Sequence, residues 1–370
     1  MKIGIITFHA AFNYGSMLQA WALQTYLERQ GHCVEIVNFR PKSQKKGYHK
    51  PISFASIHTS YNSLRRLLLA PDTIPSLSKK WHLFDEFMHK YLNLTKEYTC
   101  IEDLRNAKFN YDVLVTGSDQ IWNTQTFDFS EAYFGTFVNS HTIKIAYAPS
   151  MGPNPEKQDI AYIKKLLNGF SSVAVREERT KNFIVNNGIF DNVDVVLDPT
   201  MLLEKKDYDI LIDEAPLYDG DYVFYYTPGG VRHEFIGEAS TIGNQLGLPV
   251  VSESVYMPGD LKAYSNVIPF AAVGPCEFLN LVKNAKVVCG ASFHLMVFSI
   301  LFDKDFYCMN GDIDSRMNNL MKTCGTEDRI WSIVNKGNNA LRKEKYDLSP
   351  YFAEIKSKSQ QYLNLQKIEI

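Results

Sequence analysis

Five hydrogen-bonding side chains follow a short apolar run in the stretch YDVLVTGSDQIWN (111–123). They fall within six residues: Ser118, Asp119, Gln120, Trp122 and Asn123. A turn needs only one or two polar residues. This density therefore indicates a site at the end of a strand, although Trp122 can equally serve to close the end of a sheet.

Arg176 ends a second apolar run, SSVAV, and begins a helical stretch. A guanidinium group in this position can hold a phosphate or a carboxylate through two parallel hydrogen bonds. It can also pair with a nearby acid such as Glu177 or Asp198. The sequence leaves both possibilities open.

His294 lies near the start of an apolar helix, in the stretch ASFHLMVFSILF. Ser292 is a suitable N-cap for this helix, and Phe293 follows it. An imidazole at a helix start after a buried strand is expected to face a cleft, where it can act as an acid or a base. The alternative is a core histidine that is hydrogen-bonded to the backbone.

Two other loops follow apolar runs and are suited to binding an anion. In HAAFNYGS, Asn13 and Gly15 permit a tight turn and Ser16 can cap the next helix, whose free N–H groups favour negative charge. In PSMG, Ser150 and Gly152 suit a loop lined by backbone. A well-capped connection without a ligand explains the first loop equally well.

The candidate residues of these loops comprise one arginine, one histidine, one aspartate and several amides and hydroxyls. Such a set suits group transfer from an anionic donor, with His294 as the acid or base. It does not identify the donor.

Strand-like and helix-like segments alternate along the chain and must position these residues. Near-continuous Val/Ile runs separated by helices are typical of parallel sheets covered on both faces. Two series of strands are predicted: 2–8, 33–39, 111–117, 142–149, 171–177 and 193–199, then 221–227, 248–254, 285–292 and 305–310. Open sheets of this kind bind ligands beyond the carboxyl ends of their strands, so the site is expected between the two domains.

The predicted fold is therefore α/β, with two Rossmann-like doubly wound domains. We expect an N-terminal domain over 1–205 that includes a basic excursion (40–80), a C-terminal domain over 206–345 and a helical tail over 346–370. The N-terminus turns polar after a short apolar run, and no run of about 20 apolar residues exists. A cytoplasmic location is expected.

Seven segments, in this order along the chain, resemble the polysaccharide pyruvyl transferase family. TGSDQIWN (116–123) is the most specific of them. The others are NYGSMLQAWAL (13–23), IAYAPSMG (145–152), VREERTKNFIVNNGI (175–189), VLDPTMLL (196–203), GPCEFLNLVKNAKVV (274–288) and SFHLMVFSILFDKDF (292–306).

The resemblance implies a GT-B-like arrangement of the two domains and a reaction in surface polysaccharide (capsule) biosynthesis. Phosphoenolpyruvate gives its carboxyethylidene group to two hydroxyls of a sugar, so that a cyclic ketal forms and phosphate is released. It is a co-substrate; no cofactor and no metal are implied. The family's catalytic histidine falls on His294 and its strand-end arginine on Arg176.

Under this resemblance each loop acquires a role. Asp119 is expected to orient a sugar hydroxyl or His294. The residues near the helix starts, Asn13, Gly15, Ser16, Ser150, Ser292 and Phe293, are expected to bind the donor. The acceptor sugar is expected to meet Gln120, Trp122 and Asn123, with Trp122 stacking on a sugar face unless it serves only to close the sheet.

The chain departs from the family pattern in two places. Many members have an arginine two residues before the histidine, where this chain has Ser292, and a glycine after it, where this chain has Leu295. Two other functions therefore stay open: a GT-B glycosyltransferase that uses a nucleotide sugar, and a catalytically silent relative that binds glycans or anions.

The basic excursion (40–80) holds nine Lys/Arg and one acid, Asp72. Within it, YNSLRRLLLAP (61–71) is expected to form a short helix with an apolar face and a basic edge, as helices on anionic membrane surfaces do. We expect peripheral contact with the inner face of the cytoplasmic membrane and an acceptor carried on a polyprenyl diphosphate, and no nucleic-acid partner. The alternative is a solvated segment whose leucines pack on the first domain.

Overall fold

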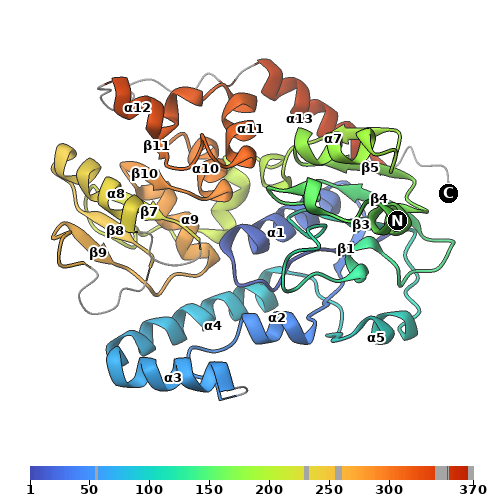
Figure 1. Ribbon diagram of the computed structural model, residues 1–370, viewed down its shortest axis with the longest axis horizontal. Helices are drawn as coiled ribbons and strands as arrows, with labels where there is room; N and C mark the ends of the chain where they lie inside the picture. The colour runs from blue at the N-terminus through green and yellow to red at the C-terminus, as the bar shows by residue number, and fades with distance from the viewer. Residues whose placement is uncertain (55–56, 229–232, 255–260, 338–347, 349, 366–370) are drawn as a thin grey trace.

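Parallel strands form two separate sheets in the computed structural model, which describes residues 1–54, 57–228, 233–254, 261–337, 348 and 350–365 (Figure 1). The strands are apolar and buried on both faces, as the Val/Ile runs predicted. This confirms the prediction of two doubly wound α/β domains.

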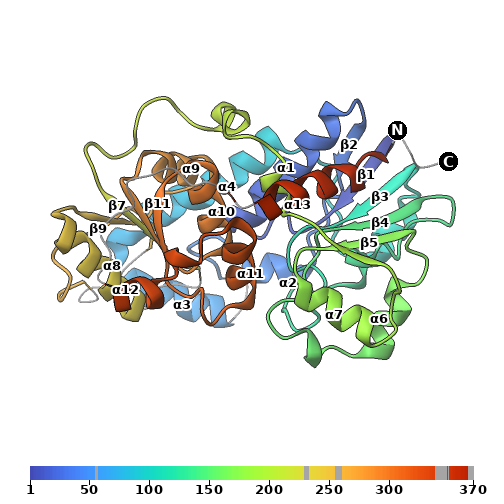
Figure 2. The ribbon, with the colours of Figure 1, turned by 90° about the horizontal axis from the view of Figure 1, so that it is seen from above.

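The first sheet has the strand order β2-β1-β3-β4-β5-β6, and every neighbouring pair is parallel. Helices α1 and α13 lie on one face of this sheet and α6 and α7 on the other (Figure 2). Its strands are β1 (Lys2–Ile6), β2 (Cys33–Ile36), β3 (Val113–Thr116), β4 (Ile143–Tyr147), β5 (Ser172–Val175) and β6 (Val193–Val195).

The second sheet has the order β11-β10-β7-β8-β9 and is also parallel. The edge strand β9 was not predicted, because it has only three residues and ends in a proline, which cannot donate to a ladder. The strands are β7 (Val223–Tyr226), β8 (Val250–Ser252), β9 (Val267–Pro269), β10 (Val287–Gly290) and β11 (Asp305–Cys308).

The helices of the described residues connect these strands and cover the sheets. They are α1 (Tyr14–Arg29), α2 (Lys42–Gly47), α3 (Ile57–Leu69), α4 (Ile74–Tyr91), α5 (Ile101–Asn106), α6 (Ile160–Leu167), α7 (Glu178–Asn186), α8 (His233–Leu246), α9 (Pro275–Asn284), α10 (Phe293–Leu301), α11 (Ser315–Cys324), α12 (Trp331–Gly337) and α13 (Pro350–Tyr362). None of them is long and apolar enough to cross a bilayer.

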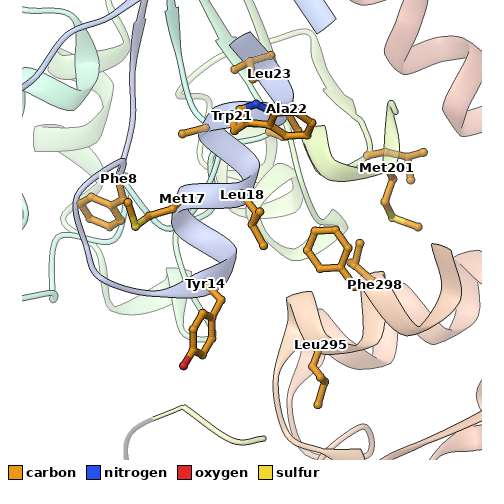
Figure 3. Close-up of a cluster of buried hydrophobic side chains, with 14 of the residues drawn as sticks. Phe8, Tyr14, Met17, Leu18, Trp21, Ala22, Leu23, Met201, Leu295 and Phe298 are labelled. Carbon is orange, nitrogen blue, oxygen red and sulfur yellow. The ribbon is translucent and has the colours of Figure 1, made fainter. Parts of the chain in front are cut away.

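Helix α1 packs between the two domains. Most of its residues are buried, because the first sheet covers one side and α10 of the second domain covers the other. Figure 3 shows Leu295 and Phe298 of α10 below Leu18 and Trp21 of α1. A helix that is apolar nearly all round is the expected consequence of burial on several sides.

The last helix, α13, returns to the first domain. Tyr362 donates a hydrogen bond to the carbonyl of Ala146, and Ser359 accepts one from the backbone N–H of Leu197. The predicted domain limits at residues 205 and 345 stay predictions; the connection between the sheets runs from Val195 to Val223.

The basic excursion (40–80) is helical and bridges the domains. Lys80 of α4 forms an ion pair with Glu253, which lies just after β8 of the second sheet. Helices α2 and α3 lie along the lower edge in Figure 1. The excursion thus contacts the second domain through Lys80 and the first domain through Lys45, which pairs with Glu97.

Candidate active site

The strand orders place the predicted loops at the two points where ligands bind in such folds. In the first sheet the order reverses between β1 and β3, and in the second between β7 and β10. Crevices at these switch points lie outside the carboxyl ends of the strands. The loops after β1, β3 and β10 carry the NYGS, GSDQIWN and SFH stretches.

The loop after β1 differs in detail from its prediction. Asn13, not Ser16, caps α1: its side-chain oxygen accepts hydrogen bonds from the N–H groups of Gly15 and Ser16. The positive φ of the turn falls on Phe12, so Gly15 is a helical residue and not a turn residue. Because Asn13 already occupies these two N–H groups, the case for an anion at this helix end is weaker than the sequence indicated.

Ser16 and Asp119 join the loops after β1 and β3. The Ser16 hydroxyl donates to Asp119 Oδ2 at 2.5 Å, while Asp119 Oδ1 accepts from the N–H of Gln120 at 2.8 Å. Asp119 has a φ of +74° and is 7% exposed. The two loops thus form one hydrogen-bonded unit with a nearly buried carboxylate.

His294 crosses from the second domain to the start of α1. Ser292 caps α10 as predicted, since its hydroxyl accepts from the N–H of Leu295. A Cβ atom on Gly15 would lie 1.9 Å from His294 Nδ1. Gly15 is therefore a glycine because the imidazole packs directly on its backbone.

Asp198, which follows β6, connects His294 to Arg176. Its Oδ2 accepts from Arg176 Nη1 at 3.0 Å and lies 3.4 Å from His294 Nε2. Thr200 donates to Oδ1 through its N–H and its hydroxyl. The sequence predicted Asp198 only as a possible ion-pair partner of Arg176. Its position at the end of the apolar run VDVVLD is the pattern that could have indicated a site residue.

Opposite charges set the protonation of this cluster. Burial by itself would raise the pKa of Asp198, but His294, Arg176 and Thr200 hold that pKa well below its usual range. Burial by itself would lower the pKa of Arg176. The nearby acids Asp198, Glu177 and Asp119 raise that pKa by more than burial lowers it, so the net shift is upward. An ionised Asp198 and a charged Arg176 follow from this arrangement.

Arg176 is thus held in the ion pair that the sequence left open as an alternative. Its Nε also lies 3.6 Å from Glu177 Oε2, and its guanidinium stacks 4.5 Å from the centre of the Phe293 ring. A small hollow between the domains lies beside this pair; its lining includes Asp198 and also Arg316 of α11. Arg316 is paired with Asp314.

The predicted acceptor residues lie in different surroundings. Trp122 is fully buried, stacks on Phe134 with ring centres 5.0 Å apart and donates its indole N–H to the Tyr133 carbonyl. Its ring has no exposed face on which a sugar could stack in this structure, as expected if Trp122 serves only to close the sheet. Gln120 and Asn123 are half-buried.

Ser150, also predicted to bind the donor, is fully buried and is hydrogen-bonded to the loop after β3. Its N–H donates to the Asp119 carbonyl, and its hydroxyl accepts from the N–H of Gly152. A Cβ atom on Gly152 would lie 2.5 Å from Asn123 Nδ2, so the Asn123 side chain packs directly on the backbone of Gly152. Ser150 thus holds Asp119 and does not face a ligand.

No group of three His, Cys, Asp or Glu side chains within the described ranges is arranged to hold a metal ion.

One protein family matches most of the chain by sequence. The sequence model of the polysaccharide pyruvyl transferase family matches residues 13–312. No curated protein sequence matches the chain significantly.

Solved structures show the same fold at low identity. UDP-GlcNAc 2-epimerase from Methanocaldococcus jannaschii aligns with a TM-score of 0.53 at 13% identity, over 99% of each chain. A putative UDP-N-acetylglucosamine 2-epimerase from Listeria monocytogenes aligns with a TM-score of 0.55 at 8% identity, over 98% of this chain and 90% of the other. These likenesses show the GT-B-like fold alone.

Proposed function

Since the chain belongs to the polysaccharide pyruvyl transferase family, we propose that it transfers the carboxyethylidene group of phosphoenolpyruvate to two hydroxyls of a sugar. The observation that carries this proposal is the meeting of His294 from one domain with Arg176 and Asp198 from the other. Family membership supports a polysaccharide-modifying enzyme; the donor and the role of His294 are our proposal.

The proposed reaction needs an acid and a base in one place. A proton added to C3 of phosphoenolpyruvate makes C2 electrophilic, and a sugar hydroxyl then bonds to C2 and loses its proton. The bond between C2 and the phosphate oxygen then breaks, the second hydroxyl bonds to C2 and loses its proton, and the ketal is complete. Of the two protons given up by the hydroxyls, one balances the proton added at C3 and the other leaves with the phosphate. Of these transfers we assign one to His294, because an imidazole can give and accept protons near neutral pH.

Asp198 is proposed to be a positioning residue for His294. Its carboxylate is fixed by Arg176 and twice by Thr200, so it offers the imidazole a rigid negative partner. A fixed carboxylate beside a histidine sets the orientation of the ring and stabilises its protonated form. Asp119, which the sequence nominated for this role, is instead bonded to Ser16.

The donor is proposed to bind beside Arg176 and Phe293. Arg176 is partly neutralised by Asp198 and Glu177, so a second cation is needed for an anionic donor. Arg316 lines the same hollow and is our candidate to replace the arginine that is absent at Ser292; its bidentate ion pair with Asp314 must open before it can hold the donor. The two guanidinium groups come from different domains.

The acceptor is proposed to approach from the side of Asp119, where Gln120 and Asn123 are half-buried. Asp119, Arg176, Asp198 and His294 are all less than a tenth exposed. An oligosaccharide can reach them only if the domains move apart, and hinged closure is common in two-domain enzymes.

The decisive experiment measures product mass and phosphate release together. The purified chain is incubated with phosphoenolpyruvate and lipid-linked galactose or mannose acceptors. A product heavier by one pyruvate unit minus water, with an equal amount of phosphate, supports the proposal. A parallel incubation replaces phosphoenolpyruvate with nucleotide sugars, and a product heavier by one sugar there identifies a glycosyltransferase. Glycan binding seen by thermal shift, without turnover of either donor, identifies a silent relative.

A further inference from the structure

Helix α3 turns an apolar face to solvent. Tyr61, Leu64 and Leu68 recur at helical spacing and are 65%, 52% and 79% exposed. Leu67 and Leu69 extend this face, and Phe54, just before α3, is 62% exposed. The alternative that the leucines of this segment pack on the first domain is therefore wrong.

The side of α3 that packs on the protein is polar or small. Thr59, Ser63 and Ala70 are buried. The Ser63 hydroxyl accepts a hydrogen bond from the N–H of Ser53 and donates one to its carbonyl, and both distances are 2.9 Å. Arg66 also faces inward and donates to the Pro51 carbonyl at 2.7 Å. These contacts fix the rotation of α3 with its apolar face outward.

A helix normally buries its apolar side, and a large exposed apolar patch marks an interaction surface. Leaving several leucines in water forgoes the stabilisation that burial would give. If α3 were rotated by half a turn about its axis, these leucines would face the protein and be buried. The outward face of α3 is therefore an interaction surface, and the charge of the residues near it indicates what binds there.

Exposed basic residues lie on α3 itself and on α2. Arg65 of α3 is exposed beside Leu64 and Leu68. Helix α2, on the same lower edge of the molecule in Figure 1, exposes Lys42, Lys45 and Lys46, of which Lys45 is paired with Glu97. The basic excursion holds one acid against its nine basic residues.

This combination distinguishes a lipid surface from a second copy of the chain. A symmetric dimer through α3 would bring two identical basic segments together, which repel each other. An anionic bilayer instead attracts the basic residues, while its acyl boundary accepts apolar side chains.

We propose that α3 docks the protein on an anionic lipid bilayer. Phe54, Tyr61, Leu64 and Leu68 enter the interface, while Arg65 and the α2 lysines meet the headgroups. This docking does not depend on the reaction proposed above. If the acceptor is lipid-linked, docking brings the protein to the surface that carries it.

The test is co-sedimentation with vesicles of phosphatidylcholine alone and of phosphatidylcholine with 30% phosphatidylglycerol, over a salt series. Wild type is expected to bind the anionic vesicles and to lose binding as salt rises. Leu68→Asp is expected to weaken binding roughly tenfold or more, because a leucine loses its burial. Arg65→Glu is expected to weaken it roughly 25-fold, about fivefold for each unit of charge changed.

Ile210→Asp is the matched control, since Ile210 is 74% exposed outside the excursion. It is expected to bind like wild type, and thermal melting confirms that each variant is folded. The proposal is overturned if wild type stays in the supernatant, or if Leu68→Asp binds as well as Ile210→Asp does. It is also overturned if Leu68→Asp dissociates a dimer in light scattering, which would make a second copy the occupant.

Discussion

Replacing Gly15 with alanine tests whether the position of His294 is needed for activity. The added Cβ atom would lie 1.9 Å from Nδ1 and 2.3 Å from Cγ of the imidazole, whereas ordinary contact begins at 3.4 Å. The ring must therefore move by about 1.5 Å. A displacement of 1 Å in a catalytic group can cost roughly 10²-fold, so we expect turnover to fall about 10²-fold or more.

The fold should survive this change. Gly15 has a helical backbone, and alanine is favoured over glycine in a helix interior by about 1 kcal/mol. Overpacking against the imidazole costs about 1–3 kcal/mol. We expect the free energy of unfolding to fall by no more than about 2 kcal/mol, measured by urea denaturation beside a phosphate-release assay.

Two controls make the result specific. Gly237→Ala changes another helical glycine, whose added Cβ would lie 3.3 Å from the Tyr264 hydroxyl and 3.4 Å from its Cε1, so that little movement is needed and activity should stay at the wild-type level. The double variant Gly15→Ala/His294→Ala should be no less active than His294→Ala, because both changes act through one imidazole. Wild-type turnover in Gly15→Ala, or additive losses in the double variant, would refute the reasoning.

Three further predictions concern the Arg176–Asp198–His294 cluster. His294→Ala should lower turnover 10²–10⁴-fold with the protein still folded; a loss below about tenfold would remove its assigned role. Arg176→Lys should raise the KM for phosphoenolpyruvate, because lysine keeps the charge and loses the fork; an unchanged KM and turnover would leave Arg176 purely structural. The pKa of Asp198 is lower in the folded chain than in the unfolded one, so its contribution to stability is present above about pH 4 and is lost as pH falls further. Asp198→Asn should therefore flatten the acid limb of the stability curve measured by urea denaturation, and an unaltered limb would count against this electrostatic account.

The two parallel sheets and the loops that carry the site could be predicted from the pattern of residues along the chain. Apolar runs of strand length separated by helices permit few arrangements other than doubly wound sheets. Once the strands are parallel, the residues that follow them must gather at one edge. The placement of Asp119 and Arg176 at one edge of the first sheet, and of His294 at the corresponding edge of the second, could thus be predicted from local pattern.

Which side chains contact one another at these edges depends on how the elements pack in three dimensions. Asp198, rather than Asp119, is the partner of His294, since the choice depends on how β6 and α10 of different domains meet. Trp122 is core because Phe134 covers its ring. The strand pattern cannot show either contact, because each joins residues from elements whose packing it does not specify.

The rotation of α3 shows the same division most clearly. Its sequence determines an amphipathic helix with an apolar side and a basic edge, and this could be predicted from its periodicity. Which side faces the protein depends on partners outside the helix: the backbone of Ser53 bonds to Ser63, and the Pro51 carbonyl bonds to Arg66. Periodicity specifies which residues share a face, whereas only contacts with distant or irregular segments determine whether that face is buried.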